Sequence, residues 1–190
     1  MGRKAQPQIK QNLLDRCTEY ALAHGLPDRV EPLAKASGTS ARMLLYHFGT
    51  RDDLLREILR QARQGQLDMF TSLLKPRGGE PYTVTLERAW RQMTSPDGQP
   101  YLRMFGQLRE STGQRLWPGF KRIATTDWIP PLEEGLASLG RPELATLTLA
   151  VIRGLFMDLD ATGDKTRADL AFTDFIGMLT CDGPDRSTPS

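Results

Sequence analysis

The 190-residue chain has two cysteines, two histidines and no long hydrophobic run. Cys17 and Cys181 lie far apart, which argues against a disulfide framework and suits a reducing compartment. His24 and His47 lack metal-ligand spacing, and no nucleophile–base set can be assembled by spacing, so we expect no cofactor and no enzyme. No apolar stretch is long enough to span a membrane or to serve as a signal peptide. We therefore expect a cytoplasmic protein.

Acidic residues are missing from one stretch, since none lies between positions 32 and 51. Residues 1–63 carry eleven Lys and Arg against seven acids, whereas residues 64–190 carry fourteen against sixteen. The first segment therefore has a charge of +4 and the second −2, within a total of +2. A polyanion would be steered to the N-terminal part, although chance clustering of charges explains the counts equally well.

Period-2 alternation of β-branched residues is also absent, and apolar residues recur at helical spacing along the whole chain. The sequence therefore predicts an all-α fold. Asp28 is expected to cap a short second helix that Gly38 ends, and Pro130-Pro131 are expected to kink or split a later one. A tail over residues 182–190 is expected to be disordered. The other helices are expected at about 8–24, 41–48, 51–74, 82–93, 101–111, 118–139, 142–161 and 166–179.

Gly38-Thr39-Ser40 separates two short expected helices near the N-terminus. Gly38 permits a tight turn, and Ser40 is a good N-cap for the helix at 41–48. Two short helices joined by a tight turn can place the second helix in the major groove of DNA. The inward face is expected to consist of Leu44, Leu45 and Phe48. The outward face offers donors and no acids: Arg42, Met43, Tyr46 and His47.

The segment from Ala36 to Leu55, ASGTSARMLLYHFGTRDDLL, resembles the recognition-helix region of TetR-type (tetracycline-repressor-like) transcriptional regulators. The spacing of Ser40, His47-Phe48, Arg51 and Leu54-Leu55 is the specific part of the match. Leu45 stands where the family usually has Tyr, and Arg42 where it usually has Gly. The resemblance implies an N-terminal helix-turn-helix DNA-binding domain at 1–50 joined to a larger C-terminal helical ligand-binding and dimerisation domain at 51–181.

The resemblance also implies a palindromic double-stranded operator as partner, with specific contacts from the helix at 41–48. Arg42 could read a guanine edge and Met43 a thymine methyl, whereas Tyr46 and His47 are expected to touch the backbone or buttress the helix. The alternatives are a solvated Arg42 and a purely structural His47. The full set of expected DNA-binding residues is Arg3, Lys4, Lys10, Arg29, Thr39, Ser40, Ala41, Arg42, Met43, Tyr46, His47 and Arg51.

The C-terminal part is expected to bind a small, mostly apolar or aromatic effector and to form a homodimer. Aromatic residues gather in its central helices, and the helix at 142–161 is apolar almost all round, so it must be covered on more than one side. The alternative for each aromatic residue is an ordinary core position. The expected ligand-binding residues are Trp90, Met93, Phe105, Trp117, Phe120, Trp128 and Met157. The expected dimer contacts are Leu147, Val151, Gly154, Leu155, Phe172, Phe175, Ile176 and Leu179.

Two further interpretations stay open. The segment from Asp158 to Asp169 mimics a calcium-binding loop, but its last position lacks the usual Glu, and a helix that ends at Gly163 explains it equally well. A helical small-molecule-binding protein or enzyme without specific DNA binding is the alternative to a regulator. The acid-free helix with its Arg argues against that alternative.

Overall fold

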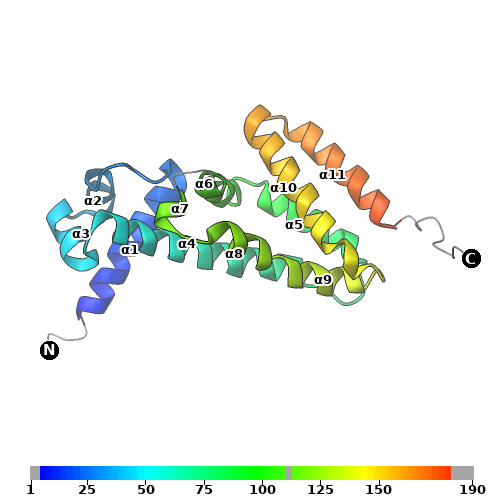
Figure 1. Cartoon of the computed structure of the whole chain (residues 1–190), viewed down its shortest axis with the longest axis horizontal. Coiled ribbons are helices and arrows are strands. Elements are labelled where there is room, and N and C mark those ends of the chain that lie inside the picture. Colours follow the sequence, from blue (N-terminus) through cyan, green and yellow to red (C-terminus); the bar gives the residue numbers. More distant parts are fainter. Residues whose placement is uncertain (1–4, 110–112, 181–190) are drawn as a thin grey trace, which may run out of the picture. The chain divides into compact units, whose positions relative to one another are not determined.

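The computed structural model describes residues 5–109 and 113–180 of the chain, and every regular element within them is helical. This confirms the all-α prediction. Figure 1 shows the helices with the labels used below. In chain order they are α1 (Ala5–His24), α2 (Glu31–Ser37), α3 (Ala41–Phe48), α4 (Arg51–Leu74), α5 (Tyr82–Met93), α6 (Gln99–Arg109), α7 (Gly113–Leu116), α8 (Phe120–Thr126), α9 (Ile129–Ala137), the 3-10 turn η1 (Pro142–Leu144), α10 (Ala145–Thr162) and α11 (Lys165–Thr180).

The chain divides into two compact units. The first unit comprises Met1–Met69 and Ser95–Ile123, and the second comprises Phe70–Thr94 and Ala124–Ser190. The domain boundary expected after residue 50 separates two expected functions and does not coincide with the boundary between the packed units. It stays a prediction.

The helix α4 contributes a large part of its buried apolar surface to the first unit. This helix presents a continuous apolar stripe whose members are fully buried, as its helical periodicity predicts. In the same unit α1 packs against α2 and α6, and α2 packs against α3. Cys17 of α1 is buried, and its Sγ lies 3.8 Å from the carbonyl oxygen of Leu33, which ties α1 to α2. Burial raises the pKa of this thiol. The buried stripe consists of Leu54, Leu55, Ile58, Leu59 and Ala62.

The second unit has an aromatic core. The helices α10 and α11 lie side by side in it (Figure 1), and α11 also contacts α5. The indole of Trp90 stacks between Phe156 and Phe172, with ring centroids 5.2 Å and 4.7 Å away. Its Nε1 donates to Asp169 at 2.8 Å, so the buried indole keeps its hydrogen bond.

The helical segment expected at 118–139 is split near its two prolines, which is one of the two expected outcomes. The helix α8 ends at Thr126 and α9 begins at Ile129, so the break precedes the prolines. Pro130 and Pro131 fall in the first turn of α9, where a backbone N–H has no partner within the helix and the proline φ suits the helix. The prolines therefore lie at the start of a new helix, so the segment is split and not kinked. The helix expected from Pro142 likewise begins with a 3-10 turn, and α10 proper starts at Ala145.

Within residues 5–109 and 113–180 no helix is long and apolar enough to cross a membrane. The same residues hold no cluster of three or more His, Cys, Asp or Glu that could bind a metal ion. At the calcium-like segment, α10 ends in a left-handed Gly163 with φ of 69°. Asp158 pairs with Arg167 at 2.6 Å and Asp169 with Lys165 at 2.7 Å. These ion pairs occupy two of the carboxylates of the segment, which supports its interpretation as a helix end over a calcium-binding loop.

Candidate nucleic-acid interface and aromatic cluster

The turn between α2 and α3 is built on Gly38, whose φ of 71° lies in the left-handed region. The N–H of Thr39 donates to the carbonyl of Ala34 at 3.0 Å, which closes the end of α2 as predicted. The prediction that Asp28 caps α2 is wrong, because the helix begins at Glu31 and its N-cap position is Val30, without a side-chain cap. The carboxylate of Asp28 instead lies 3.9 Å from the guanidinium of Arg51.

The helix α3 spans the predicted residues and begins with the predicted cap. The Oγ of Ser40 accepts a hydrogen bond from the N–H of Met43 at 3.2 Å. Leu44 and Phe48 are buried, one turn apart on the inner face. The inward position predicted for Leu45 is wrong, since 38% of its surface is exposed. Each residue turns the helix by about 100°, so Leu45 lies beside the stripe formed by Leu44 and Phe48 and not on it. This eight-residue helix buries only that narrow stripe.

The exposed face of α3 carries Arg42, Met43 and Tyr46, and the Tyr46 side chain is 69% exposed. His47 is half-buried, and its ring meets Tyr46 edge-on at 5.2 Å. The helix holds no acidic residue. This face can donate hydrogen bonds and offer apolar contacts without repelling a polyanion.

The other expected DNA-binding residues differ in their exposure and in their contacts. Ser40 and Arg29 are exposed, and Thr39 and Ala41 are half-buried. The ammonium of Lys10 lies 5.0 Å above the ring of Phe48, which brings a cation of α1 to the end of α3. Their contacts with DNA stay predictions. Arg3 and Lys4 lie outside the described residues.

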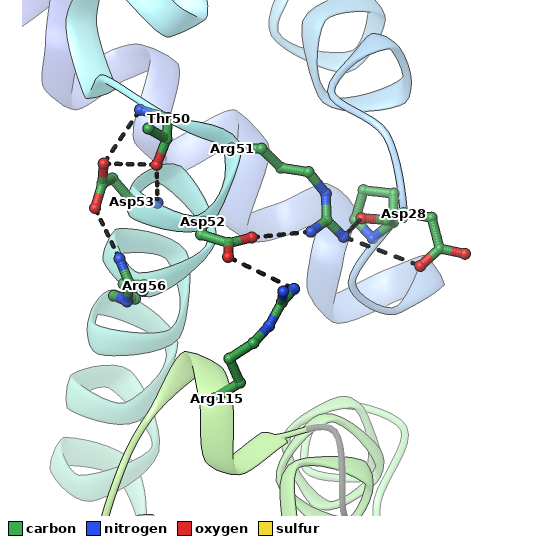
Figure 2. A network of polar contacts seen from close by, with 8 residues as sticks. Asp28, Thr50, Arg51, Asp52, Asp53, Arg56 and Arg115 are labelled. Carbon is green, nitrogen blue, oxygen red and sulfur yellow. Dashed lines mark hydrogen bonds and ion pairs between the residues drawn. The ribbon is translucent and has the colours of Figure 1, made fainter.

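The start of α4 is fixed by a reciprocal cap (Figure 2). The N–H of Asp53 donates to the Oγ1 of Thr50 at 3.1 Å, and the Oδ2 of Asp53 accepts from the N–H of Thr50 at 3.2 Å. The hydroxyl of Thr50 also donates to this carboxylate, and these bonds hold the pKa of Asp53 below its usual range. Thr50 is therefore the N-cap of α4.

Arg51 has a contact that the sequence did not suggest (Figure 2). Its Nη2 donates to the carbonyl of Pro27 at 2.8 Å, and its Nη1 to Asp52 at 3.0 Å. Arg115 of α7 reaches the other oxygen of Asp52 at 3.5 Å. Arg51 thus holds the loop before α2 against the start of α4. The phosphate contact expected from Arg51 stays a prediction, and its guanidinium already serves this internal role.

Three of the expected ligand-binding residues form one cluster in the first unit. The rings of Phe105 and Phe120 stack at 5.4 Å, and Trp117 meets Phe120 at 5.3 Å. A residue missed at the sequence level joins them: the guanidinium carbon of Arg63 lies 5.8 Å from the Phe105 ring and 5.9 Å from the Phe120 ring. We call Arg63, Phe105, Trp117 and Phe120 the aromatic cluster.

The other four expected ligand-binding residues belong to the second unit. Trp90 and Met93 are buried there, and Trp128 packs on Phe70 at a centroid distance of 6.0 Å. Met157 is 70% exposed in the single chain. Their place in a ligand site stays a prediction. A cavity of about 140 Å³ in the first unit has a different lining, contributed by residues 21–24 of α1, by Gly25 and by Arg103 and Met104 of α6.

The described structure has counterparts among solved proteins. A transcriptional regulator from Rhodococcus sp. Rha1 superposes with a TM-score of 0.71 at 20% identity, over 92% of this chain and 99% of that one. A Rhodococcus sp. protein assigned to the TetR family gives a TM-score of 0.66 at 18% identity, over 92% and 100%. The chain has the TetR-type fold. The multidrug binding protein EbrR, complexed with proflavin, gives 0.64 at 20% identity, over 90% and 99%. No protein-family model and no curated protein matches the sequence.

The TetR-type fold leaves an apolar surface on α10 of this chain. Leu147 and Met157 are exposed, Gly154 lies between them, and Val151 and Leu155 are half-buried. On α11 the expected dimer residues Phe172, Phe175, Ile176 and Leu179 are instead buried inside the chain itself. Their interface role stays a prediction, but these four side chains have little surface left for a partner. Leu170 and Met178 are the exposed large apolar residues of α11, and periodicity alone did not separate the two faces.

Proposed function

We propose that this chain is a ligand-responsive transcriptional repressor that binds a palindromic operator as a homodimer. The observation that carries the proposal is α3 itself: an exposed, acid-free helix, capped by Ser40 and entered through the left-handed Gly38. Such a helix N-terminus can approach phosphates while its side chains meet base edges in the major groove. The likeness in fold to transcriptional regulators supports the same function.

Binding to the DNA upstream of the protein's own gene tests the proposal. We expect affinity for that DNA to exceed affinity for random DNA of equal length by at least about 10³-fold, because base contacts add to the phosphate contacts. Both affinities should fall as salt rises, since phosphate contacts release counterions. Equal affinity for the two DNAs at every salt concentration contradicts a specific operator in that region.

The dimer part of the proposal rests on the apolar surface of α10. Gly154 lies at its centre, and a Cβ added there would meet no atom within 4 Å in the single chain. A larger residue at this position is therefore tolerated by the protomer and can only collide with a partner. A twofold axis through this surface would give two α3 helices for two operator half-sites.

We predict that Gly154→Gln weakens dimerisation by about 5- to 150-fold, the effect of about 1–3 kcal/mol of overpacking at an interface. Sedimentation equilibrium of the full chain measures it. Gly106→Gln is the matched control, because Gly106 is also helical and a Cβ there also meets no atom within 4 Å. We expect neither variant to lower the melting temperature of the protomer. An unchanged dimer in Gly154→Gln contradicts close approach at this surface.

The effector part of the proposal rests on the aromatic cluster, whose three rings suit an apolar or aromatic molecule. EbrR, which shares the fold, has been crystallised with proflavin and with imidazole. Release from DNA requires the effector to bind the DNA-competent and DNA-incompetent conformations with unequal affinity. The cluster lies in the same unit as α3, so a ligand bound at the cluster can affect DNA binding by α3.

A further inference from the structure

The guanidinium of Arg51 makes its hydrogen bonds within the protein (Figure 2). Its Nη2 donates to the carbonyl oxygen of Pro27 at 2.8 Å, and its Nη1 donates to the Oδ1 of Asp52 at 3.0 Å. Its Nε is buried and has no hydrogen-bond partner. A bidentate contact with phosphate uses two neighbouring N–H groups on one edge of a guanidinium. Pro27 and Asp52 occupy one such edge of Arg51, and the other edge includes the buried Nε.

The bond to Pro27 fixes the loop over residues 25–30, which connects α1 to α2. Val30, the last residue of this loop, is the N-cap of α2, and no side chain caps that helix start. Arg29 is exposed in the same loop and belongs to the expected DNA-binding residues. Because α2 packs against α3, the hold on this loop also bears on the position of α3.

Asp52 connects this arrangement with α7. Its Oδ1 accepts from Arg51, and its Oδ2 lies 3.5 Å from the Nη2 of Arg115. The pair of Arg51 and Asp52 is largely sheltered, with side chains 28% and 29% exposed, whereas Arg115 is 74% exposed. An ion pair as exposed as the one with Arg115 contributes little by itself. Arg115 lies two residues before Trp117 of the aromatic cluster, so a shift of α7 changes what Asp52 contacts.

Asp28 provides the contrast within the same network. Its carboxylate lies 3.9 Å from Arg51, and its side chain is fully exposed. Solvent screens a pair of this kind, so Asp28 does little to orient the guanidinium. Asp28 is therefore the matched control for removal of an acid beside Arg51.

We propose that Arg51 and Asp52 are positioning residues for DNA binding. Asp52 orients the Arg51 guanidinium, and Arg51 holds the loop over residues 25–30, and with it α2 and α3, relative to the start of α4. In this role Arg51 makes no phosphate contact. The inference rests on the proposed DNA-binding function and assigns part of its specificity to two residues outside α3.

The sign of the effect of Asp52→Asn tests this role. If Arg51 bound phosphate, loss of a neighbouring acid would leave DNA affinity unchanged or raise it, because DNA is a polyanion. We expect instead that Asp52→Asn weakens binding to the DNA upstream of the protein's own gene by about 3- to 10-fold, the effect of one hydrogen bond. Affinity for random DNA should stay unchanged or rise.

Fluorescence anisotropy with labelled duplexes measures both affinities. Asp28→Asn should weaken neither, because it removes the same charge without releasing the guanidinium. Binding of Asp52→Asn to upstream DNA at or above the wild-type affinity overturns the proposal. An equal loss in Asp28→Asn also overturns it.

Arg51→Gln separates the two roles through salt. It should weaken binding to upstream DNA by about 10-fold, because it removes the bond to Pro27. The slope of log affinity against log salt on random DNA should remain that of wild type, since no phosphate contact is lost. A slope lowered by about one for each protomer shows that Arg51 contacts phosphate and overturns the proposal.

A double variant tests whether Asp52 acts through Arg51. Arg51→Gln combined with Asp52→Asn should bind upstream DNA like Arg51→Gln alone, because the second change removes a partner that is already lost. Additive losses overturn the positioning role of Asp52. Arg115→Gln should cost no more than about 3-fold, and nothing further in an Asp52→Asn background.

Amide hydrogen exchange of the full chain tests the positioning without DNA. Exchange in residues 25–30 should rise by about 3-fold or more in Asp52→Asn and in Arg51→Gln, and should keep the wild-type rate in Asp28→Asn. Wild-type exchange of this loop in both variants overturns the inference and leaves the proposed function intact. If the wild-type chain binds upstream and random DNA equally, the proposed operator fails, and the exchange rates still decide whether Arg51 and Asp52 hold the loop.

Discussion

Gly135→Ala is expected to destabilise the chain by about 3 kcal/mol, the upper end of the usual cost of overpacking a core. A Cβ at Gly135 would lie 1.8 Å from the Cζ of the Tyr82 ring. Tyr82 is almost fully buried, and burial raises the pKa of its phenol. Its hydroxyl lies 3.5 Å from the carbonyl of Pro131 on the same helix as Gly135, so the ring lies directly along α9. The ring therefore cannot move aside into solvent, and α9 must shift.

Urea unfolding followed by far-UV circular dichroism measures the loss. For a chain of this length, about 3 kcal/mol corresponds to a fall in melting temperature of about 6–12 °C. Gly106→Ala is the matched control, since its Cβ meets no atom, and there alanine should leave stability unchanged or raise it by up to about 1 kcal/mol.

A double variant tests the cause of the loss. Tyr82→Leu removes the ring atoms nearest to Gly135, so Gly135→Ala should cost much less in a Tyr82→Leu background than in wild type. Additive losses in the double variant would show that the Tyr82 ring is not what excludes a side chain at position 135.

The sequence predicts those parts of the fold in which local pattern and burial agree. The stripe of α4 recurs at helical spacing over several turns, so its inward face is unambiguous, and Leu54, Leu55 and Ile58 are buried as expected. The cap at Ser40 and the turn at Gly38 follow from local backbone chemistry. Leu45 fails because two adjacent leucines in a helix of eight residues leave the phase of the stripe undetermined.

The candidate site could not be predicted from hydrophobic periodicity alone. An apolar stripe shows that a helix must be covered, but it does not show whether the same chain or a partner covers it. The dimer role expected for Phe172 and Phe175 therefore stays a prediction, although the chain itself already buries both side chains. The polar contacts of Arg51 and Arg63 connect residues far apart in the sequence. The charge of such a residue suggests a solvated surface position until the fold shows what surrounds it.

Arg42→Ala is expected to weaken binding by about 5- to 150-fold for each operator half-site, the effect of about 1–3 kcal/mol from the one bidentate guanine contact that each half-site loses. Arg42 is exposed near the start of α3, so its removal should change the free energy of unfolding by no more than about 0.5 kcal/mol. Affinity for random DNA should fall much less than affinity for the operator, because a base contact adds little to non-specific binding.

Lys10→Ala provides the contrast that identifies the kind of contact. Lys10 lies on α1, beside the Phe48 ring at the end of α3, where a backbone phosphate is its expected partner. Its removal should weaken operator and random DNA alike and lower the salt slope by about one for each phosphate that the lysine no longer neutralises. Selection of bound sequences from a random pool should then show relaxed preference at one symmetric pair of positions for Arg42→Ala and unchanged preference for Lys10→Ala. If Arg42→Ala instead weakens both DNAs equally and keeps the wild-type sequence preference, Arg42 contacts phosphate, and the bases must be read by other residues of α3, of which Met43 and Tyr46 are the exposed candidates.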